Sequence, residues 1–261
     1  FALNKPLVPV HHIEGHIAAN YIENINWEPP FMCLIVSGGH THLVHIKDYD
    51  DFDILGKTRD DAAGEAFDKV AKMLNLGYPG GPMIEKMAAK GDENRFTLPH
   101  PLSNSGDMNL SFSGLKTAVR KIIESYSPDG KLEHAILNDK DTADICACFQ
   151  KTAAECLTIK LEKAIRYFKA SYPNGKDLVV AGGVAANTYL REALQKLADR
   201  HKLLFSAPPV RFCTDNGVMI AWAGLERFQN GYVNDLDFKP RPRWPLDENA
   251  PKAAGAGGVK A

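Results

Sequence analysis

Three segments in the first quarter of the chain carry the pattern of β-strands. Residues 32–37, 41–47 and 52–57 alternate in polarity or run apolar over strand lengths, and short turns separate them. They predict a three-stranded antiparallel meander. A shorter apolar run at 6–10 predicts another strand, one without a preceding partner, and residues 11–22 have helical character.

The meander leads into helical segments and loops. Asp60 and Asp61 precede a helical run that ends near residue 74, and we expect their carboxylates to accept the free N–H groups of its first turn. Residues 77–125 are rich in Gly, Pro, Ser and Asn, which predicts loops plus a helix over 113–125. This section has the composition of an insertion around a ligand rather than of a core layer.

The second half of the chain alternates helices with short strands. The pattern predicts a long helix at 142–170, a strand at 177–181, a helix at 188–200, a strand at 202–206 and a helix at 217–228. Such alternation favours parallel strands with helical crossovers. A meander followed by helix, strand, helix, strand, helix is the unit of the RNase H-like lobes of actin, hexokinase and Hsp70. The predicted fold class is therefore α/β with ASKHA lobes, a fold that hosts many functions.

The overall charge is nearly balanced, with 31 Lys and Arg residues against 32 Asp and Glu. No general positive field marks the chain as a binder of polyanions, so any contact with nucleic acid must be local. Two groups of basic residues are candidates: Lys160, Lys163, Arg166 and Lys169, and then Lys239, Arg241 and Arg243. A solvated helix face explains the first group at least as well as RNA binding does.

The cysteines and the apolar runs indicate a compartment. The five cysteines lie in apolar segments without Cys-x-x-Cys spacing, which disfavours disulfides and favours a reducing environment. No stretch approaches the roughly 18 apolar residues of a membrane helix. We expect a cytoplasmic protein without membrane contact. The chain starts at Phe1 rather than Met, which suggests a fragment, and residues 246–261 have the composition of a disordered tail.

The sharpest local feature is the histidine-rich segment 11–16. On a helix, His12 and His16 lie four residues apart on one face, so their imidazoles can share a transition metal; packing or solvent exposure is the alternative. Glu14 points elsewhere, and the absence of a His-Glu-x-x-His string disfavours a zinc protease. The best third ligand is Asp215, which stands before an apolar helix and alternatively caps it.

Three Gly-rich turns lie at the ends of predicted strands or helices. Residues 37–41 join two strands of the meander. Their small side chains would let backbone N–H groups approach an anion closely. The alternative is an ordinary hairpin turn. Residues 181–187 follow a strand and open a helix, so a phosphate or nucleoside can sit there, unless Asn187 only caps that helix. Residues 79–82 predict a rigid turn.

Three carboxylates, Asp61, Glu65 and Asp68, recur on one face of the helix after the meander. They form either a solvated face or, in a cleft, a site for ribose hydroxyls or cations. The residues alone leave this choice open.

Eight short motifs, taken together, match one family in order and spacing. They are His-His-Ile-Glu-Gly-His at 11–16, Leu-Ile-Val-Ser-Gly-Gly-His-Thr at 34–41, Asp-Asp-Ala-Ala-Gly-Glu-Ala-Phe-Asp-Lys at 60–69, Tyr-Pro-Gly-Gly-Pro at 78–82, Ser-Phe-Ser-Gly-Leu-Lys-Thr at 111–117, Ala-Gly-Gly-Val-Ala-Ala-Asn at 181–187, Cys-Thr-Asp-Asn-Gly at 213–217 and Arg-Pro-Arg-Trp at 241–244. The chain resembles the bacterial TsaD family, the tRNA N6-adenosine threonylcarbamoyltransferases once labelled O-sialoglycoprotein endopeptidases or glycoproteases. Any one motif is weak, whereas eight in register, reaching to Pro245, are highly specific.

The resemblance implies transfer of a threonylcarbamoyl group from threonylcarbamoyl-AMP to N6 of adenosine 37, in tRNAs that read codons beginning with A. By analogy, His12, His16 and Asp215 bind one divalent metal and act in catalysis through it, with iron (Fe²⁺) favoured and zinc as the alternative. The resemblance also assigns residues to the substrate. Those for the phosphate and acyl portion are Ile35, Val36, Ser37, Gly38 and Gly39, and those for the nucleotide are Asp68, Gly81 and Asn187.

Partners and lobes follow from the same resemblance. It implies tRNA and threonylcarbamoyl-AMP as substrates, and a paralogous TsaB-like ASKHA subunit and a small TsaE-like ATPase as partners. Family members begin with a segment that builds the first lobe, and from the resemblance we expect this sequence to be a fragment without that segment. We expect residues 1–30 to be a remnant of that lobe and residues 31–245 to be the catalytic lobe, with an insertion at about 77–140. We also expect this polypeptide alone to be poorly active or inactive.

Three rival functions stay open at this point. The His pair and the old family label favour a metallopeptidase, against which the nucleotide-type loops count. A degenerate paralogue would be a noncatalytic ASKHA scaffold, but a scaffold has no need of an open metal site. A kinase fits the fold, but kinases hold their metal by carboxylates and phosphates rather than by two imidazoles.

Overall fold

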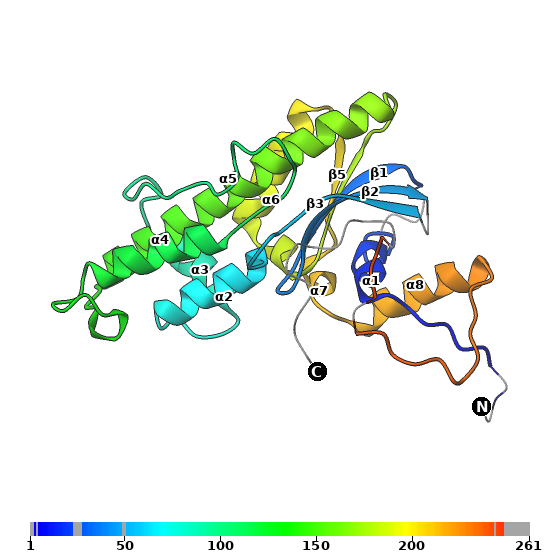
Figure 1. Ribbon diagram of the computed structural model, residues 1–261, viewed down its shortest axis with the longest axis horizontal. Coiled ribbons are helices and arrows are strands. Elements are labelled where there is room, and N and C mark those ends of the chain that lie inside the picture. The colour runs from blue at the N-terminus through cyan, green and yellow to red at the C-terminus, as the bar shows by residue number, and fades with distance from the viewer. Residues whose placement is uncertain (1–2, 4, 23–27, 49–50, 243, 248–261) are drawn as a thin grey trace.

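The centre of the molecule is a five-stranded mixed sheet in the order β3-β2-β1-β4-β5 (Figure 1). The computed structural model describes residues 3, 5–22, 28–48, 51–242 and 244–247. Its strands are β1 Phe31–Val36, β2 Thr41–Asp48, β3 Asp51–Lys57, β4 Asp177–Ala181 and β5 Leu204–Ser206. The first three pair antiparallel, whereas β4 lies parallel to both β1 and β5. The predicted meander and the parallel crossovers are therefore confirmed.

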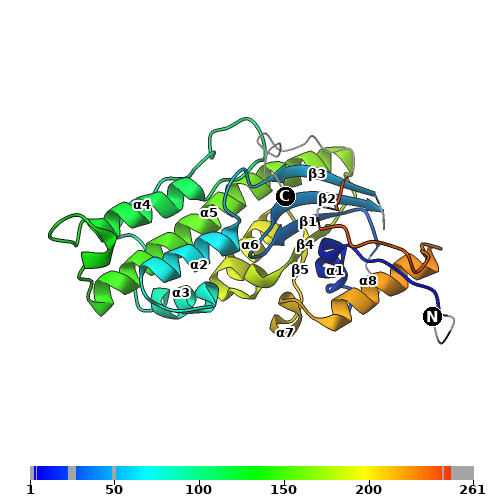
Figure 2. The ribbon, with the colours of Figure 1, turned by 60° about the horizontal axis from the view of Figure 1, so that its bottom comes forward.

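Helices cover both faces of the sheet (Figures 1 and 2). They are α1 His12–Ala18, α2 Ala63–Met73, α3 Gly80–Ala88, α4 Ser113–Glu124, α5 Asp139–Ser171, α6 Thr188–Arg200, α7 Val210–Cys213 and α8 Gly217–Gln229, with short 3₁₀ helices η1 Leu132–His134 and η2 Gly183–Ala186. Alternate residues of β1 separate two cores, because side chains of a strand point to opposite faces. Leu34 joins the larger core with α2 to α6, and Ile35 joins the smaller core with α1 and α8.

Two segments near the ends of the described chain depart from the predictions. Residues 6–10 form no strand beyond an isolated bridge between Leu7 and Asn234, because Pro6 and Pro9 have no N–H to pair. A disordered tail was expected from residue 246, but Leu246 packs on the smaller core and Asp247 accepts a hydrogen bond from the Ile54 N–H. Residues 248–261 lie outside the described residues.

The section 77–125 contributes to the main core, contrary to the prediction. Ile84 on α3 and Leu115, Val119 and Ile123 on α4 are fully buried within it. The helix at 113–124 is confirmed, but α3 was missed because it opens with Gly-Gly-Pro, where a rigid turn was predicted. Pro is compatible with the first turn of a helix because the N–H it lacks would have no partner there.

Asp60 and Asp61 do not cap α2, as was predicted. The cap position is Ala62, whose N–H donates to Glu65 Oε2 at 3.3 Å. Asp60 instead accepts hydrogen bonds from the Phe112 and Ser113 N–H groups at the start of α4. Asp61 lies between Lys69 and Lys116, with N–O distances of 2.7 and 2.6 Å. Local sequence favours a cap, but both carboxylates bind a helix that follows some fifty residues later.

The basic residues of α5 have structural partners. The Lys160 ammonium is buried and donates to the Ser105–Asp107 loop, and Lys163 donates to the carbonyl of Ser105. Arg166 pairs with Glu162, and Lys169 donates to the carbonyl of His201. In the second basic group, Arg241 stacks on Phe238 and Trp244, while Arg243 lies outside the described residues. No helix in the described part of the chain is long and apolar enough to cross a membrane.

Candidate functional site

His12, His16 and Asp215 come together from the two ends of the chain. The distance from Asp215 Oδ1 is 3.3 Å to His12 Nε2 and 3.2 Å to His16 Nε2. One ligand atom from each of the three residues lies within 4.8 Å of the others. The structure thus brings these side chains close enough to share one ion, and metal binding by them stays a prediction.

Helix α1 presents the two histidines together because they are four residues apart. Their rings meet edge to face with centroids 4.8 Å apart. His11 is turned away from them. Its Nδ1 accepts the Ile13 N–H as the cap of α1, and its Nε2 lies 2.6 Å from the carbonyl oxygen of Trp244. The third histidine of the motif therefore starts and anchors the helix.

Asp215 does not cap α8, which was the alternative role that the sequence left open. The cap of α8 is the next residue, Asn216, whose Oδ1 accepts the Met219 N–H at 2.9 Å. The Asp215 side chain is 74% exposed and faces the histidine pair. Its carboxylate is therefore free to serve as a ligand.

The donor set fits a divalent transition metal. Two imidazole nitrogens and one carboxylate oxygen suit zinc, iron or manganese and leave coordination positions for a substrate. His16 is buried, and burial lowers its pKa; the nearby His12 lowers it further, while Asp215 opposes the shift. A lowered pKa favours the neutral imidazole, which is the form that binds metal.

The turn 37–40 presents backbone to open space beside this centre. The Ser37 N–H donates to the carbonyl of His40, which closes the turn, while Gly38 and Gly39 are exposed, and a Cβ added at either would contact nothing within 4 Å. Ile35 and Val36 are fully buried in β1. Neither residue therefore offers a surface to a ligand in this structure, and their contact with substrate stays a prediction, whereas a ligand can approach the two exposed glycines closely.

A second glycine brings the ends of β1 and β4 together. Gly182 has a φ of +98°, and a Cβ there would lie 2.5 Å from the Val36 carbonyl oxygen, so a larger side chain is excluded. The adjacent Gly183 lies near Thr214, which precedes the proposed metal ligand. The turn after β1, the segment after β4 and the α7–α8 loop thus meet at one end of the sheet. Ligands bind at the carboxyl ends of strands in many open α/β sheets.

Of the remaining predicted substrate residues, Asp68 and Asn187 have partners within the chain. Asp68 Oδ1 accepts the Gly80 N–H at 2.8 Å, and Gly81 faces open space. Asn187 is buried and caps α6 by accepting the Leu190 N–H, which confirms that alternative. The Thr188 N–H at the same terminus donates to Glu85. Because these groups are engaged, an anion has less access to the α6 terminus than the sequence suggested, and substrate binding by Asp68, Gly81 and Asn187 stays a prediction.

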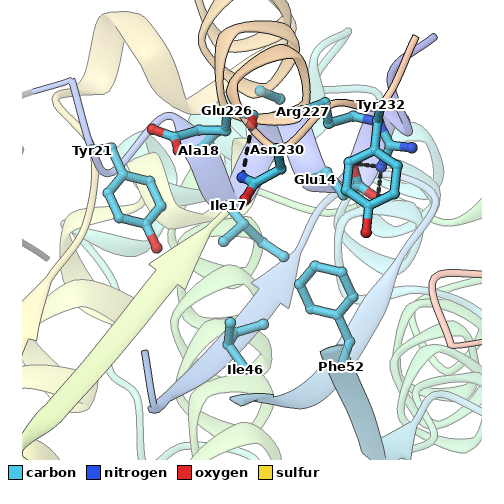
Figure 3. A pocket seen from close by; sticks show the side chains of 11 residues that line it. Glu14, Ile17, Ala18, Tyr21, Ile46, Phe52, Glu226, Arg227, Asn230 and Tyr232 are labelled. Carbon is cyan, nitrogen blue, oxygen red and sulfur yellow. Dashed lines mark hydrogen bonds and ion pairs between the residues drawn. The ribbon is translucent and has the colours of Figure 1, made fainter. Parts of the chain in front are cut away.

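Two arginines near the site gave no signal in the sequence. Arg191 on α6 contacts the loop before Asp215, and Arg227 on α8 pairs with Glu14 between the two histidines of α1. Figure 3 shows the Arg227 and Glu14 side chains meeting beside Tyr232, at a cavity of about 50 Å³. Partners this distant along the chain cannot be recognised from local spacing.

Comparisons with known proteins identify the family. The family model described as TsaD, tRNA N6-adenosine threonylcarbamoyltransferase, matches residues 1–222. The chain belongs to this family. It is therefore a transferase. Relatives that carry the same enzyme name include proteins of Rhodospirillum rubrum, 52% identical over 98% of this chain and 69% of the relative, and Brucella suis, 47% identical over 100% of this chain and 71% of the relative.

Solved structures agree on the fold. The chain is similar to HypF of T. kodakarensis, with a TM-score of 0.63 and 17% identity over 88% of this chain and 38% of that one. A second HypF structure, in a phosphate- and nucleotide-bound form, gives a TM-score of 0.59 and 12% identity over 87% and 37%. At this identity the likeness concerns the fold alone. The predicted α/β fold class with ASKHA architecture is confirmed.

Proposed function

We propose that this chain acts in tRNA modification by transferring a threonylcarbamoyl group from threonylcarbamoyl-AMP to N6 of adenosine 37, in tRNAs that read codons beginning with A. Family membership supports the reaction class. The observation that supports the site is the meeting of His12, His16 and Asp215 beside the turn at 37–40. A metal centre next to two exposed glycines suits a substrate that joins an acyl carbon to a phosphate.

In this proposal His12, His16 and Asp215 hold one divalent metal, with iron favoured and zinc as the alternative. When bound, that metal supplies Lewis-acid stabilisation of the negative charge that develops at the acyl group. The burial of His16 keeps its imidazole neutral for this task. Asp215 balances part of the positive charge and, being exposed, leaves one side of the centre open.

The turn at 37–40 and the facing segments orient the donor. The exposed residues Gly38 and Gly39 are suited to the phosphate, since small residues let an anion approach the backbone. Asp68, Gly81 and Asn187 hold the nucleotide. The adenosine N6 then attacks the carbamoyl carbon, the bond from that carbon to the phosphate oxygen breaks, N6 loses one proton, and AMP leaves.

The surroundings of Glu14 speak against a metallopeptidase. That reaction needs a carboxylate beside the metal-bound water. Glu14 is the acidic residue of the histidine motif, and its carboxylate is paired with Arg227, 3.1 Å away on α8. We propose that the reaction takes place in the cytoplasm, together with a TsaB-like subunit and a TsaE-like ATPase.

The test is threonylcarbamoyl transfer to unmodified tRNA. Because the chain spans 69% and 71% of the two relatives, the assay uses the chain extended to their length, with partner subunits and chemically prepared threonylcarbamoyl-AMP. Metal-dependent formation of the modified nucleoside is expected, with loss in the double variant His12→Ala, His16→Ala. The control is His134→Ala, an exposed histidine outside the site. If nucleotide and metal bind but no product forms, the chain is a noncatalytic scaffold; peptide cleavage that requires His12 would support the peptidase.

A further inference from the structure

Arg191 connects two segments that meet at the candidate site. It lies on the first turn of α6, and its Nε donates to the carbonyl of Ala185 in η2. Its Nη2 donates to the carbonyl of Pro208 and lies 3.2 Å from the Cys213 sulfur. One guanidinium group thus binds η2 on one side and both ends of the short stretch before Thr214 on the other.

The groups that Arg191 contacts are themselves held close together. Cys213 is fully buried, and its thiol lies 3.4 Å from the Pro208 carbonyl oxygen, to which it can donate. Arg191 thus donates to two backbone carbonyls and to this thiol sulfur. Its role is to hold the chain in place.

The segment that Arg191 holds leads directly to Asp215. That residue is 74% exposed, and within the described chain its carboxylate contacts His12 and His16. The position of its carboxylate therefore depends on the backbone of the α7–α8 loop. On the α8 side the loop is fixed by the Asn216 cap, and on the α7 side by Arg191. A planar guanidinium can bind several acceptors at fixed angles, whereas a lysine ammonium on a flexible stem cannot reproduce that arrangement.

We propose that Arg191 is a positioning residue for the metal centre: by joining η2 to the Pro208–Cys213 stretch, it sets Asp215 at ligand distance from the two histidines. This inference rests on the proposed function in taking those three residues as the metal ligands. It assigns Arg191 no contact with the metal or with the substrate.

Zn²⁺ affinity of the folded chain tests the proposal, measured by competition with a chelating dye. The variants are Arg191→Ala and Arg191→Lys. Loss of a residue that supports a ligand typically weakens metal binding by about 10- to 100-fold. We expect at least the lower value for Arg191→Ala and an intermediate loss for Arg191→Lys. Co²⁺ bound in place of Zn²⁺ should show a changed visible absorption spectrum, which a remote loss of stability would not produce.

The matched control is Arg200→Ala, an exposed arginine at the other end of α6, which should bind Zn²⁺ like the unchanged chain. Unchanged Zn²⁺ affinity in a folded Arg191→Ala variant would overturn the proposal. So would unfolding of both Arg191 variants, since the residue would then serve general stability. Failure of the unchanged chain to bind Zn²⁺, or binding that survives His16→Ala, would instead reject the metal site on which the inference rests.

Discussion

Glu14 and Arg227 form an ion pair between α1 and α8, with 3.1 Å between Arg227 Nη1 and Glu14 Oε2. Both side chains are more than four-fifths buried, and the arginine also stacks on Tyr232 and Trp244. Glu14 lies on the side of α1 away from Asp215, so the pair fixes the rotation of the helix that carries the histidines. The face toward the proposed metal centre is then left to His12 and His16.

A double-mutant cycle should detect this pair. We expect Glu14→Gln or Arg227→Met alone to lower the free energy of unfolding by about 2 kcal/mol, because each leaves a partner with little water around it. The double variant should lose less than the sum, with a coupling of at least about 1 kcal/mol. Urea denaturation measures all four proteins. The exposed pair Arg166–Glu162 is the control, with an expected coupling of about 0.5 kcal/mol or less; equal couplings would contradict the prediction.

Asp60 should stabilise α4 rather than α2. Its carboxylate accepts the Phe112 and Ser113 N–H groups at 2.8 and 3.2 Å. Because those groups have no partner within the helix, Asp60→Ala should cost about 1 to 2 kcal/mol of unfolding free energy, and Asp60→Asn less. Hydrogen exchange should show faster opening of α4, with α2 unaffected. Asp199→Ala, at an exposed position on α6, serves as the control. Faster exchange in α2 alone would support the capping role that the sequence first suggested.

Lys160 should be a structural lysine. Its ammonium is almost fully buried and donates to Ser105 Oγ at 2.6 Å and to the Asp107 carbonyl at 2.9 Å. Removing it leaves buried acceptors unpaired, so Lys160→Met should lower the free energy of unfolding by about 2 kcal/mol. The comparison is Lys196→Met, 78% exposed, with an expected change within about 0.5 kcal/mol. Acetic anhydride should modify Lys196 well before Lys160, and early labelling of Lys160 would refute its burial.

The strands and the pairing of His12 with His16 were predictable from sequence because they depend on short spacings. A buried strand such as β1 is a continuous apolar run, and the His12–His16 pair needs only the helical repeat. Family motifs added Asp215, which no local pattern distinguished from a helix cap. The structure separates the two roles by giving the cap to Asn216.

The contacts that could not be predicted from the sequence join segments that lie far apart along the chain. Asp60 has the residue type and position of a helix cap, yet its partners lie 52 and 53 residues further along. The Arg227–Glu14 contact spans 213 residues. Arginine and aspartate at such positions are compatible with solvent exposure as well as with a buried contact. Only the three-dimensional fold shows whether such a side chain is exposed or buried, and a buried charge pair, unlike an exposed one, costs stability when one partner is removed.

Acid should destabilise the protein through the histidines beside the site, His42 above all. This residue of β2 has an Nδ1 atom that is buried without a hydrogen-bond partner in the described chain. Burial, together with the smaller effects of nearby His40, Lys57 and His11, lowers the pKa of His42 from 6.5 to about 4. The unfolded chain therefore takes up a proton between pH 6.5 and about 4, while the folded chain does not. Stability is complete above pH 6.5 and falls as the pH drops through this window.

The pH dependence can be assigned to His42 by substitution. Between about pH 7.5 and about pH 5, the share of His42 in the loss of unfolding free energy should be about 2 kcal/mol. Burial also lowers the pKa values of His16, His40 and His45, so the unchanged chain should lose more than this share. His42→Asn should reduce the loss by the His42 share, whereas His134→Asn, an exposed site, should leave it as it is. Urea denaturation of the metal-free proteins at both pH values provides the measurement. If His42→Asn and the unchanged chain lose the same unfolding free energy between the two pH values, His42 takes up its proton equally in the folded and unfolded states.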